Sequence, residues 1–201
     1  MISYPKIGLA LGSGGFRGFA HIGVIQVLQE NKIPVDYISG ASIGALVGAY
    51  FAIHSDLDML EQEIVMNNKE KLPTLFDLGL RGGLVSGRKF EIFLERVLGR
   101  KNFSDCRLPL RIVATDLVGG QAQILSQGRL ATAVRASTSV PLVFEPVRSR
   151  GHLLVDGGLS NPVPVNLLHD MGADKIIAVN LYHHNEFVER KFNMPTVALR
   201  A

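Results

Sequence analysis

Residues 35–53 read VDYISGASIGALVGAYFAI, and they carry the strongest structural signal in the chain. The first five, 35–39, are typical of a short buried β-strand, and the small and apolar residues from Gly44 to Ile53 predict a helix. The glycines and alanines of this helix leave one of its sides nearly smooth, which permits close packing of a helix on a sheet. The segment therefore predicts a strand, a tight turn at Ser42 and a buried helix.

Ser42 stands in the pattern G-x-S-x-G, between Gly40 and Gly44. Between a strand and a helix this pattern forces the serine into a tight turn, and the two glycines remove side chains that would collide across that turn. The serine hydroxyl is then held out at the edge of the sheet, and the next helix presents its N-terminus to developing negative charge. These features predict a nucleophilic serine. The alternative is that Ser42 only caps the helix in a glycine-rich turn.

Apolar periodicity alternates between strand and helix along the rest of the chain. The predicted strands cover residues 7–11, 35–39, 111–117, 121–125, 152–155 and 175–181, and the third and fourth form a hairpin about Gly119 and Gly120. The predicted helices cover residues 16–30, 44–53, 57–66, 88–98, 130–136 and 165–171. This alternation predicts an α/β fold, a three-layer α/β/α sandwich with a mostly parallel central sheet. We expect a single domain over residues 1–201, and the lack of a stop signal at Ala201 is expected of a chain cut from a longer one.

Length and composition exclude several classes of protein. The chain has 201 residues, of which 47% are apolar and 19% charged, and this balance excludes a disordered chain. The 21 basic and 18 acidic residues give a net charge of +3, and the basic residues are scattered, so no nucleic-acid partner is expected. The one cysteine, Cys106, allows no disulfide framework. Since there is neither a signal peptide nor an apolar run of the roughly 20 residues that span a bilayer, we expect a cytoplasmic protein able to contact a membrane peripherally.

A glycine-rich segment, G-S-G-G-F-R-G at residues 12–18, follows the first predicted strand. Consecutive glycines let the backbone approach a substrate closely and expose its amides, as stabilisation of an oxyanion requires. A phosphate-binding loop is the alternative, because a glycine turn between strand and helix also suits phosphate. A dinucleotide fingerprint counted from Gly12 would need glycine at position 17, which is Arg17, and no G-K-[ST] follows. The spacing therefore favours an oxyanion loop.

Asp156 ends the predicted strand 152–155 and precedes Gly157 and Gly158. An aspartate before two glycines is often only a turn residue. In a chain that also carries a serine elbow and an oxyanion loop, it becomes the leading candidate for the general base. A carboxylate is a weak base for a serine hydroxyl, so burial or an apolar wall must raise its pKa.

The chain resembles the patatin-like phospholipase family, in particular its bacterial and neuropathy-target-esterase-like members. Four blocks occur in the order of the family: G-S-G-G-F-R-G with A-H-I-G (12–23), G-A-S-I-G (40–44), A-S through V-P to F-E-P (136–146), and D-G-G (156–158). Residues 113–117 also resemble the central strand of the family. Each block is moderately specific, and the ordered set is highly specific.

The resemblance implies a Ser-Asp dyad that hydrolyses acyl esters of lipids without a metal or an organic cofactor. Carried over by position, Ser42 is the nucleophile and Asp156 the base. The oxyanion loop then contains Gly14, Gly15 and Phe16, steadied by Arg17, and the supporting glycines are Gly12, Gly18, Gly40, Gly44, Gly157 and Gly158. The family has glycine where this chain has Ser13, and we expect the loop to accept this small residue.

We therefore expect a serine hydrolase of the phospholipase A or lysophospholipase type that works through an acyl-enzyme. The partner is a lipid or another acyl ester. Phospholipid, lysophospholipid, neutral lipid and short-chain esters stay open, because pocket shape sets specificity. The alternative from another class is a non-catalytic lipid-binding or regulatory protein on the same scaffold, and a nucleotide-binding module ranks third.

A Ser-Asp-His triad is the alternative to the dyad, since His169, His183 and His184 follow Asp156 in the chain. We expect none of them to act, and we expect a carboxylate base to give a pH profile unlike that of a histidine, which titrates near 6.5. His183 and His184 have no partners at metal-binding spacing.

Several other residues are expected to have structural roles. These are His21, Asp77 and Asp116. Residues 67–87, which are rich in glycine and leucine, are equally compatible with a lid over the acyl pocket and with a loop that fills the core.

Overall fold

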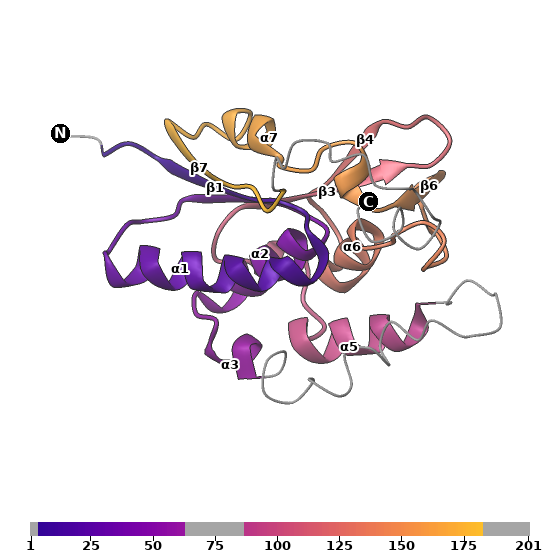
Figure 1. Cartoon of the computed structure of the whole chain (residues 1–201), viewed down its shortest axis with the longest axis horizontal. Helices are drawn as coiled ribbons and strands as arrows, with labels where there is room; N and C mark the ends of the chain where they lie inside the picture. The colour runs from indigo at the N-terminus through magenta and orange to yellow at the C-terminus, as the bar shows by residue number, and fades with distance from the viewer. Residues whose placement is uncertain (1–3, 63–86, 183–201) are drawn as a thin grey trace, which may run out of the picture.

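The computed structural model describes residues 4–62 and 87–182, which form a central sheet with helices on both faces (Figure 1). The strands are β1 (Ile7–Leu11), β2 (Tyr37–Ala41), β3 (Leu110–Asp116), β4 (Ala122–Leu125), β5 (Val147–Ser149), β6 (His152–Val155) and β7 (Lys175–Val179). The helices are α1 (Ala20–Glu30), α2 (Ile43–His54), α3 (Asp58–Glu61), α5 (Arg88–Leu98), α6 (Leu130–Ser137) and α7 (Val165–His169). Short 3-10 turns follow β1, precede β3 and follow β6, namely η1 (Gly15–Phe19), η3 (Phe103–Asp105) and η4 (Gly157–Leu159).

The sheet has the strand order β5-β6-β3-β2-β1-β7, with β4 paired to β3 beside β6. β3, β2, β1 and β7 run parallel to one another, whereas β4 and β6 pair antiparallel with β3, and β5 pairs antiparallel with β6. The predicted α/β fold is confirmed, and the sheet is mixed. The hairpin of β3 and β4 also forms as predicted, because the amide of Gly120 closes the turn on the carbonyl of Asp116 at 2.8 Å.

Helix α2 lies at the centre of the fold, against β1, β2 and β3 on one side and against α1, α5 and α6 on the other (Figure 1). All residues from Gly44 to Ile53 are buried, as expected of a helix that is apolar on every side. Gly48 faces the sheet, where an added Cβ would lie 3.0 Å from the side chain of Ile38. Helix α7 covers the opposite face of β1, β2 and β7, which completes the three layers.

Several predicted boundaries differ from the structure. β2 begins two residues later than predicted and runs to Ala41, directly before Ser42. The predicted helix 16–30 divides into η1 and α1. The last predicted strand, 175–181, ends at Val179, and β5 was not predicted. The helix predicted at 57–66 is present as α3, and residues 63–66 lie outside the described residues. The predicted lid, residues 67–87, also lies outside them apart from Gly87.

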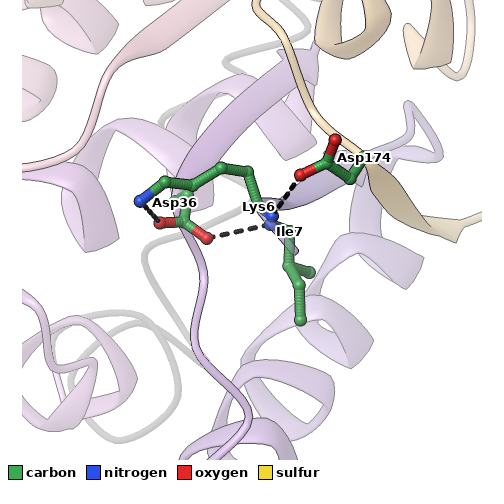
Figure 2. Close-up of polar contacts among 4 residues, drawn as sticks. All are labelled: Lys6, Ile7, Asp36 and Asp174. Carbon is green, nitrogen blue, oxygen red and sulfur yellow. Dashed lines mark hydrogen bonds and ion pairs between the residues drawn. The ribbon is translucent and has the colours of Figure 1, made fainter. Parts of the chain in front are cut away.

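Asp36 and Asp174 explain where β1 and β2 begin (Figure 2). The carboxylate of Asp36 accepts hydrogen bonds from the backbone N–H of Ile7 and from Lys6 Nζ, each at 2.8 Å, and the carboxylate of Asp174 accepts the backbone N–H of Lys6 at 2.7 Å. The hydrogen bond from Lys6 lowers the pKa of Asp36. The two carboxylates thus replace ladder partners at the start of β1, and they fix its register between β2 and β7.

Candidate active site

Ser42 lies in the turn between β2 and α2, with φ 54° and ψ −122°. This left-handed backbone is strained for a residue with a side chain. An added Cβ on Gly40 would lie 2.6 Å from the carbonyl oxygen of Gly44, and one on Gly44 would overlap the carbonyl of Leu11. Ser42 occupies the N-cap position of α2, but its side chain makes no capping hydrogen bond. The geometry therefore disagrees with the interpretation of Ser42 as a simple helix cap.

The hydroxyl of Ser42 donates a 2.6 Å hydrogen bond to Asp156 Oδ2. The sheet brings the two together, because β3 lies between β2 and β6 and its register places Ala41 beside Val113 and Val155 beside Thr115. The residues that follow Ala41 and Val155 therefore meet over the same part of β3. A nucleophile and a base of a serine hydrolase need this hydrogen-bond contact.

The other carboxylate oxygen of Asp156 caps its own turn. Oδ1 accepts the backbone N–H of Gly158 at 2.8 Å, while the backbone of Asp156 is held by the Thr115 hydroxyl, at 2.7 Å from its carbonyl oxygen. The Asp156 side chain thus does both things: one oxygen stabilises the turn, as an aspartate before two glycines often does, and the other binds Ser42. Gly157 is required there, since an added Cβ would overlap the carbonyl of Val113.

The environment of Asp156 makes its carboxylate more basic. Only 6% of the residue is exposed, and burial raises the pKa of Asp156 from 3.8 to about 6, against the opposing effect of the hydrogen bonds from Ser42 and Gly158. Among the described residues, no Lys, Arg or His forms an ion pair with it. The burial that a carboxylate base needs is therefore present.

The start of the glycine-rich segment is fixed by hydrogen bonds to the strand β7 and to the segment before α7. The amide of Gly12 donates to the carbonyl of Val179 at 3.0 Å, and the amide of Ser13 donates to the carbonyl of Pro162 at 2.8 Å. On the other side, His21 Nε2 donates to the carbonyl of Gly12 at 2.7 Å. The peptide between Gly12 and Ser13 is held through both its N–H and its C=O. These hydrogen bonds fix the position of the residue at which the loop begins.

The next two amides of this loop are available to a ligand. Within residues 4–62 and 87–182, the N–H groups of Gly14 and Gly15 donate no hydrogen bond. Gly15 has φ 56°, and an added Cβ on Gly14 would lie 2.9 Å from Leu181, so both positions favour glycine. Phe16, which follows them, is 61% exposed. Such amides are the groups that stabilise an oxyanion.

Two contacts tie the end of this loop to its surroundings. Gly18 lies against Ile43, the residue after Ser42, so closely that an added Cβ would overlap the isoleucine side chain. Arg17 donates from Nη1 to the carbonyl of Leu181 at 3.3 Å. The loop therefore lies beside the serine turn, and Arg17 holds it to the segment that follows β7.

Ser13, the second residue of the glycine-rich segment, is 2% exposed. Its hydroxyl lies 2.9 Å from the hydroxyl of Tyr182 and next to Gly158, where an added Cβ would come within 2.6 Å of Ser13 Oγ. The serine is accommodated because it finds one polar partner in Tyr182 and a glycine opposite.

The remaining histidines and carboxylates lie elsewhere. His21 is fully buried on α1, where burial lowers its pKa, and its Nδ1 has no partner among the described residues. His169 is exposed at the end of α7, and Asp116 pairs with His152 at 3.2 Å. No described histidine hydrogen-bonds to Ser42 or Asp156. The described residues contain no group of three potential metal ligands, and His183, His184 and Asp77 lie outside them.

Cys106 and an open groove lie away from Ser42 and Asp156. Cys106 is a half-buried free thiol whose pKa burial raises to about 11. The groove has a volume of about 590 Å³ and is lined by residues that include Tyr37 and Leu110. Because these two residues begin β2 and β3, the groove lies at the opposite end of the strands from Ser42. No described helix has the length and apolarity that crossing a bilayer requires.

The sequence analysis did not assign a role to Ser137, Ser139 or Thr115, although all three contact the pair of Ser42 and Asp156. Ser137 and Ser139 belong to the third motif block, and the signal that could have found them is a group of hydroxyl residues that closes an otherwise apolar helix.

Comparisons with known proteins point to one family. Residues 9–169 match the family described as Patatin-like phospholipase. An NTE family protein of Mycobacterium bovis is 36% identical over 180 residues, which are 89% of this chain and 50% of that protein. The Drosophila melanogaster neuropathy target esterase sws is 35% identical over 88% of this chain and 13% of its own length. Human patatin-like phospholipase domain-containing protein 6 is 33% identical over 90% of this chain and 14% of its own length.

The fold also has a solved counterpart. VipD from Legionella pneumophila superposes with a TM-score of 0.53 and 18% identity, over 77% of this chain and 46% of that one, and this likeness concerns the fold alone. The chain spans half the length of the mycobacterial relative and about a seventh of the length of the human one. On the match to the family and the identity to these relatives, the chain belongs to the patatin-like phospholipase family.

Proposed function

We propose that the chain is a serine hydrolase that cleaves acyl ester bonds of lipids, in the manner of a phospholipase A or lysophospholipase. The observation that carries the proposal is the 2.6 Å hydrogen bond from Ser42 Oγ to the buried carboxylate of Asp156. The names of the relatives, a neuropathy target esterase and a phospholipase domain protein, support the same class of reaction.

In the first step, Asp156 Oδ2 takes the hydroxyl proton of Ser42 while Ser42 Oγ attacks the ester carbonyl. The carbonyl oxygen becomes an oxyanion, which the amides of the Gly14–Gly15–Phe16 loop stabilise. The carbon–oxygen bond to the alcohol then breaks, and the leaving alcohol or lysolipid takes the proton from Asp156. An acyl group remains on Ser42.

In the second step, a water molecule replaces the alcohol. Asp156 accepts one proton of the water, whose oxygen attacks the acyl carbonyl, and the same loop stabilises the second oxyanion. Collapse of this intermediate releases the fatty acid and returns the proton to Ser42. Both steps balance with the groups of the chain, the ester and water.

Exposed apolar side chains beside the site support peripheral contact with a lipid surface. Phe16 in the glycine loop and Leu159 after the D-G-G motif are 61% and 49% exposed. Because exposed apolar groups gain free energy when they leave water, this rim favours substrates that are presented in a lipid assembly.

Covalent labelling tests the proposal. A fluorophosphonate reacts only with an activated serine, so we expect the wild-type protein to be labelled and Ser42→Ala to remain unlabelled. If the folded wild-type protein binds lipid vesicles but is neither labelled nor able to hydrolyse any ester in a panel of lipids, the non-catalytic alternative replaces the proposal.

A further inference from the structure

The C-terminal end of α6 gathers an unusual set of buried polar side chains. Arg135, Ser137, Thr138 and Ser139 are 4%, 0%, 9% and 0% exposed. Buried polar groups destabilise a fold unless they form hydrogen bonds, so each of these side chains needs partners. The Ser137 hydroxyl binds the backbone of Ser42, and the backbone carbonyl of Ser139 binds the backbone of Asp156.

Ser137 contacts the backbone of the candidate nucleophile. The N–H of Ser42 donates to Ser137 Oγ at 2.8 Å, across 95 residues of sequence. This contact fixes the peptide that enters the strained backbone of Ser42. Ser137 Oγ also lies 3.2 Å from the position of an added Cβ on Gly157, so the same hydroxyl packs against the D-G-G motif.

Ser139 contacts the backbone of the candidate base. The N–H of Asp156 donates to the carbonyl oxygen of Ser139 at 2.9 Å. Ser137 and Ser139 are two residues apart in one turn, so a single short segment holds the main chain of both Ser42 and Asp156.

Arg135 anchors this segment to the rest of the fold. Its guanidinium donates to Ser139 Oγ and to the carbonyl oxygen of Glu145 at 3.2 Å, and it stacks 4.9 Å from the centre of the Phe144 ring. In turn, Ser139 Oγ donates to the carbonyl oxygen of Arg135 at 2.7 Å. The end of α6 is therefore rigid where it meets Ser42 and Asp156.

We propose that Ser137 is a positioning residue of the hydrolysis, which holds Ser42 in the backbone conformation that keeps its hydroxyl on Asp156. This inference rests on the proposed function, and it assigns a role to a residue that touches neither the ester nor the carboxylate. Ser137 acts through the backbone of Ser42, and Ser139 holds the backbone of Asp156 in the same way.

The variant Ser137→Ala removes the acceptor and leaves the N–H of Ser42 buried without a partner. We expect kcat for a short-chain ester to fall roughly 10- to 100-fold while KM changes little, and we expect fluorophosphonate labelling of Ser42 to slow by a similar factor. The acid limb of the pH profile should stay where it is, because Ser137 does not touch the Asp156 carboxylate. Ser137→Cys keeps a weaker acceptor and should fall between Ser137→Ala and the wild type.

Thr138→Val is the matched control. It removes a buried hydroxyl from the same helix end, but in the described part of the chain that hydroxyl bonds only to the carbonyl oxygens of Val134 and Arg135, at 2.8 and 3.2 Å. We expect Thr138→Val to keep the wild-type kcat and labelling rate.

Wild-type kcat and labelling in folded Ser137→Ala would overturn the inference, and so would a loss that Thr138→Val matches. If Ser137→Ala does not fold, a folded Ser137→Cys variant with wild-type kcat overturns it equally. An unlabelled and inactive wild-type protein removes the proposed function and this inference together, whereas an active wild type with an unaffected Ser137→Ala removes the inference alone.

Discussion

The hydroxyls of Ser13 and Tyr182 lie 2.9 Å apart, although 169 residues separate them in the chain. Ser13 stands among the glycines of residues 12–18, and Tyr182 lies in the segment that Arg17 binds through the carbonyl of Leu181. This pair therefore links the start of the glycine loop to the segment after β7, and it gives the buried Ser13 hydroxyl a hydrogen-bond partner.

Coupling between Ser13 and Tyr182 is the first prediction. Removal of the Tyr182 hydroxyl leaves the Ser13 hydroxyl buried without its hydrogen-bond partner. Tyr182→Phe should therefore lower the free energy of unfolding by about 1 kcal/mol. In a Ser13→Gly background the same substitution should cost much less. A double-mutant cycle from urea unfolding measures the difference. Equal effects of Tyr182→Phe in both backgrounds would mean that the two hydroxyls do not interact.

The pH dependence of stability is the second prediction. Burial raises the pKa of Asp156 from 3.8 to about 6 in the folded protein. Between these pH values the folded state binds more protons than the unfolded state, so the contribution of Asp156 to stability decreases as the pH rises from about 4 to about 6. The wild type should lose on the order of 2 kcal/mol relative to Asp156→Asn over this interval. Unfolding curves that stay parallel for the two proteins would contradict the desolvation of Asp156.

The pH dependence of activity is the third prediction. Hydrolysis should decline as the pH falls through about 6, because protonated Asp156 cannot accept the proton of Ser42. This value lies close to the roughly 6.5 of histidine, so the midpoint of the pH profile alone does not distinguish a carboxylate base from a histidine. Burial, the largest cause of the raised pKa of Asp156, brings that pKa close to the pKa of a histidine.

The direction in which an organic cosolvent moves the acid limb of the pH profile distinguishes a carboxylate base from a histidine. Lowering the dielectric constant disfavours the charged form, which raises the pKa of a carboxyl group and lowers that of a histidine. We expect the acid limb to move to higher pH in cosolvent, and we expect His169→Gln, His183→Gln and His184→Gln to keep most of the activity. A limb that moves to lower pH, or one histidine variant as inactive as Ser42→Ala but correctly folded, would favour a triad.

Lipid presentation is the fourth prediction. Phe16→Ser and Leu159→Ser should reduce hydrolysis of phospholipid vesicles several-fold more than hydrolysis of a soluble short-chain ester, because these side chains contribute apolar area beside the site. Tyr4→Ser is the control, since Tyr4 is 80% exposed but precedes β1 at the opposite end of the strand from the glycine loop. Equal losses on both substrates would assign Phe16 and Leu159 to the chemistry or the fold rather than to the lipid surface.

The strands, helices and turns with local sequence patterns were predictable, whereas the long-range contacts around Ser42 were predictable only in part. The turn at Ser42 and the D-G-G turn follow from glycine spacing and apolar periodicity, both of which are local properties of the sequence. β2 begins two residues later than predicted, and Asp36, directly before it, binds Ile7 through both its backbone and its carboxylate. The contacts of Ser42 with Ser137 and Asp156 join residues 95 and 114 positions apart. The family resemblance suggested the pair of Ser42 and Asp156, but no local pattern pointed to Ser137.

The fifth prediction concerns Ser42 and Asp156 themselves. The measurement is the rate of fluorophosphonate labelling and of ester hydrolysis in the wild type, Ser42→Ala and Asp156→Asn, with thermal unfolding as the check on folding. Ser42→Ala should show no labelling, and each variant should lose on the order of a thousandfold or more in hydrolysis while it stays folded. Near-normal turnover in folded Asp156→Asn would contradict the account, because the 2.6 Å contact between Ser42 and Asp156 would then have no part in the reaction.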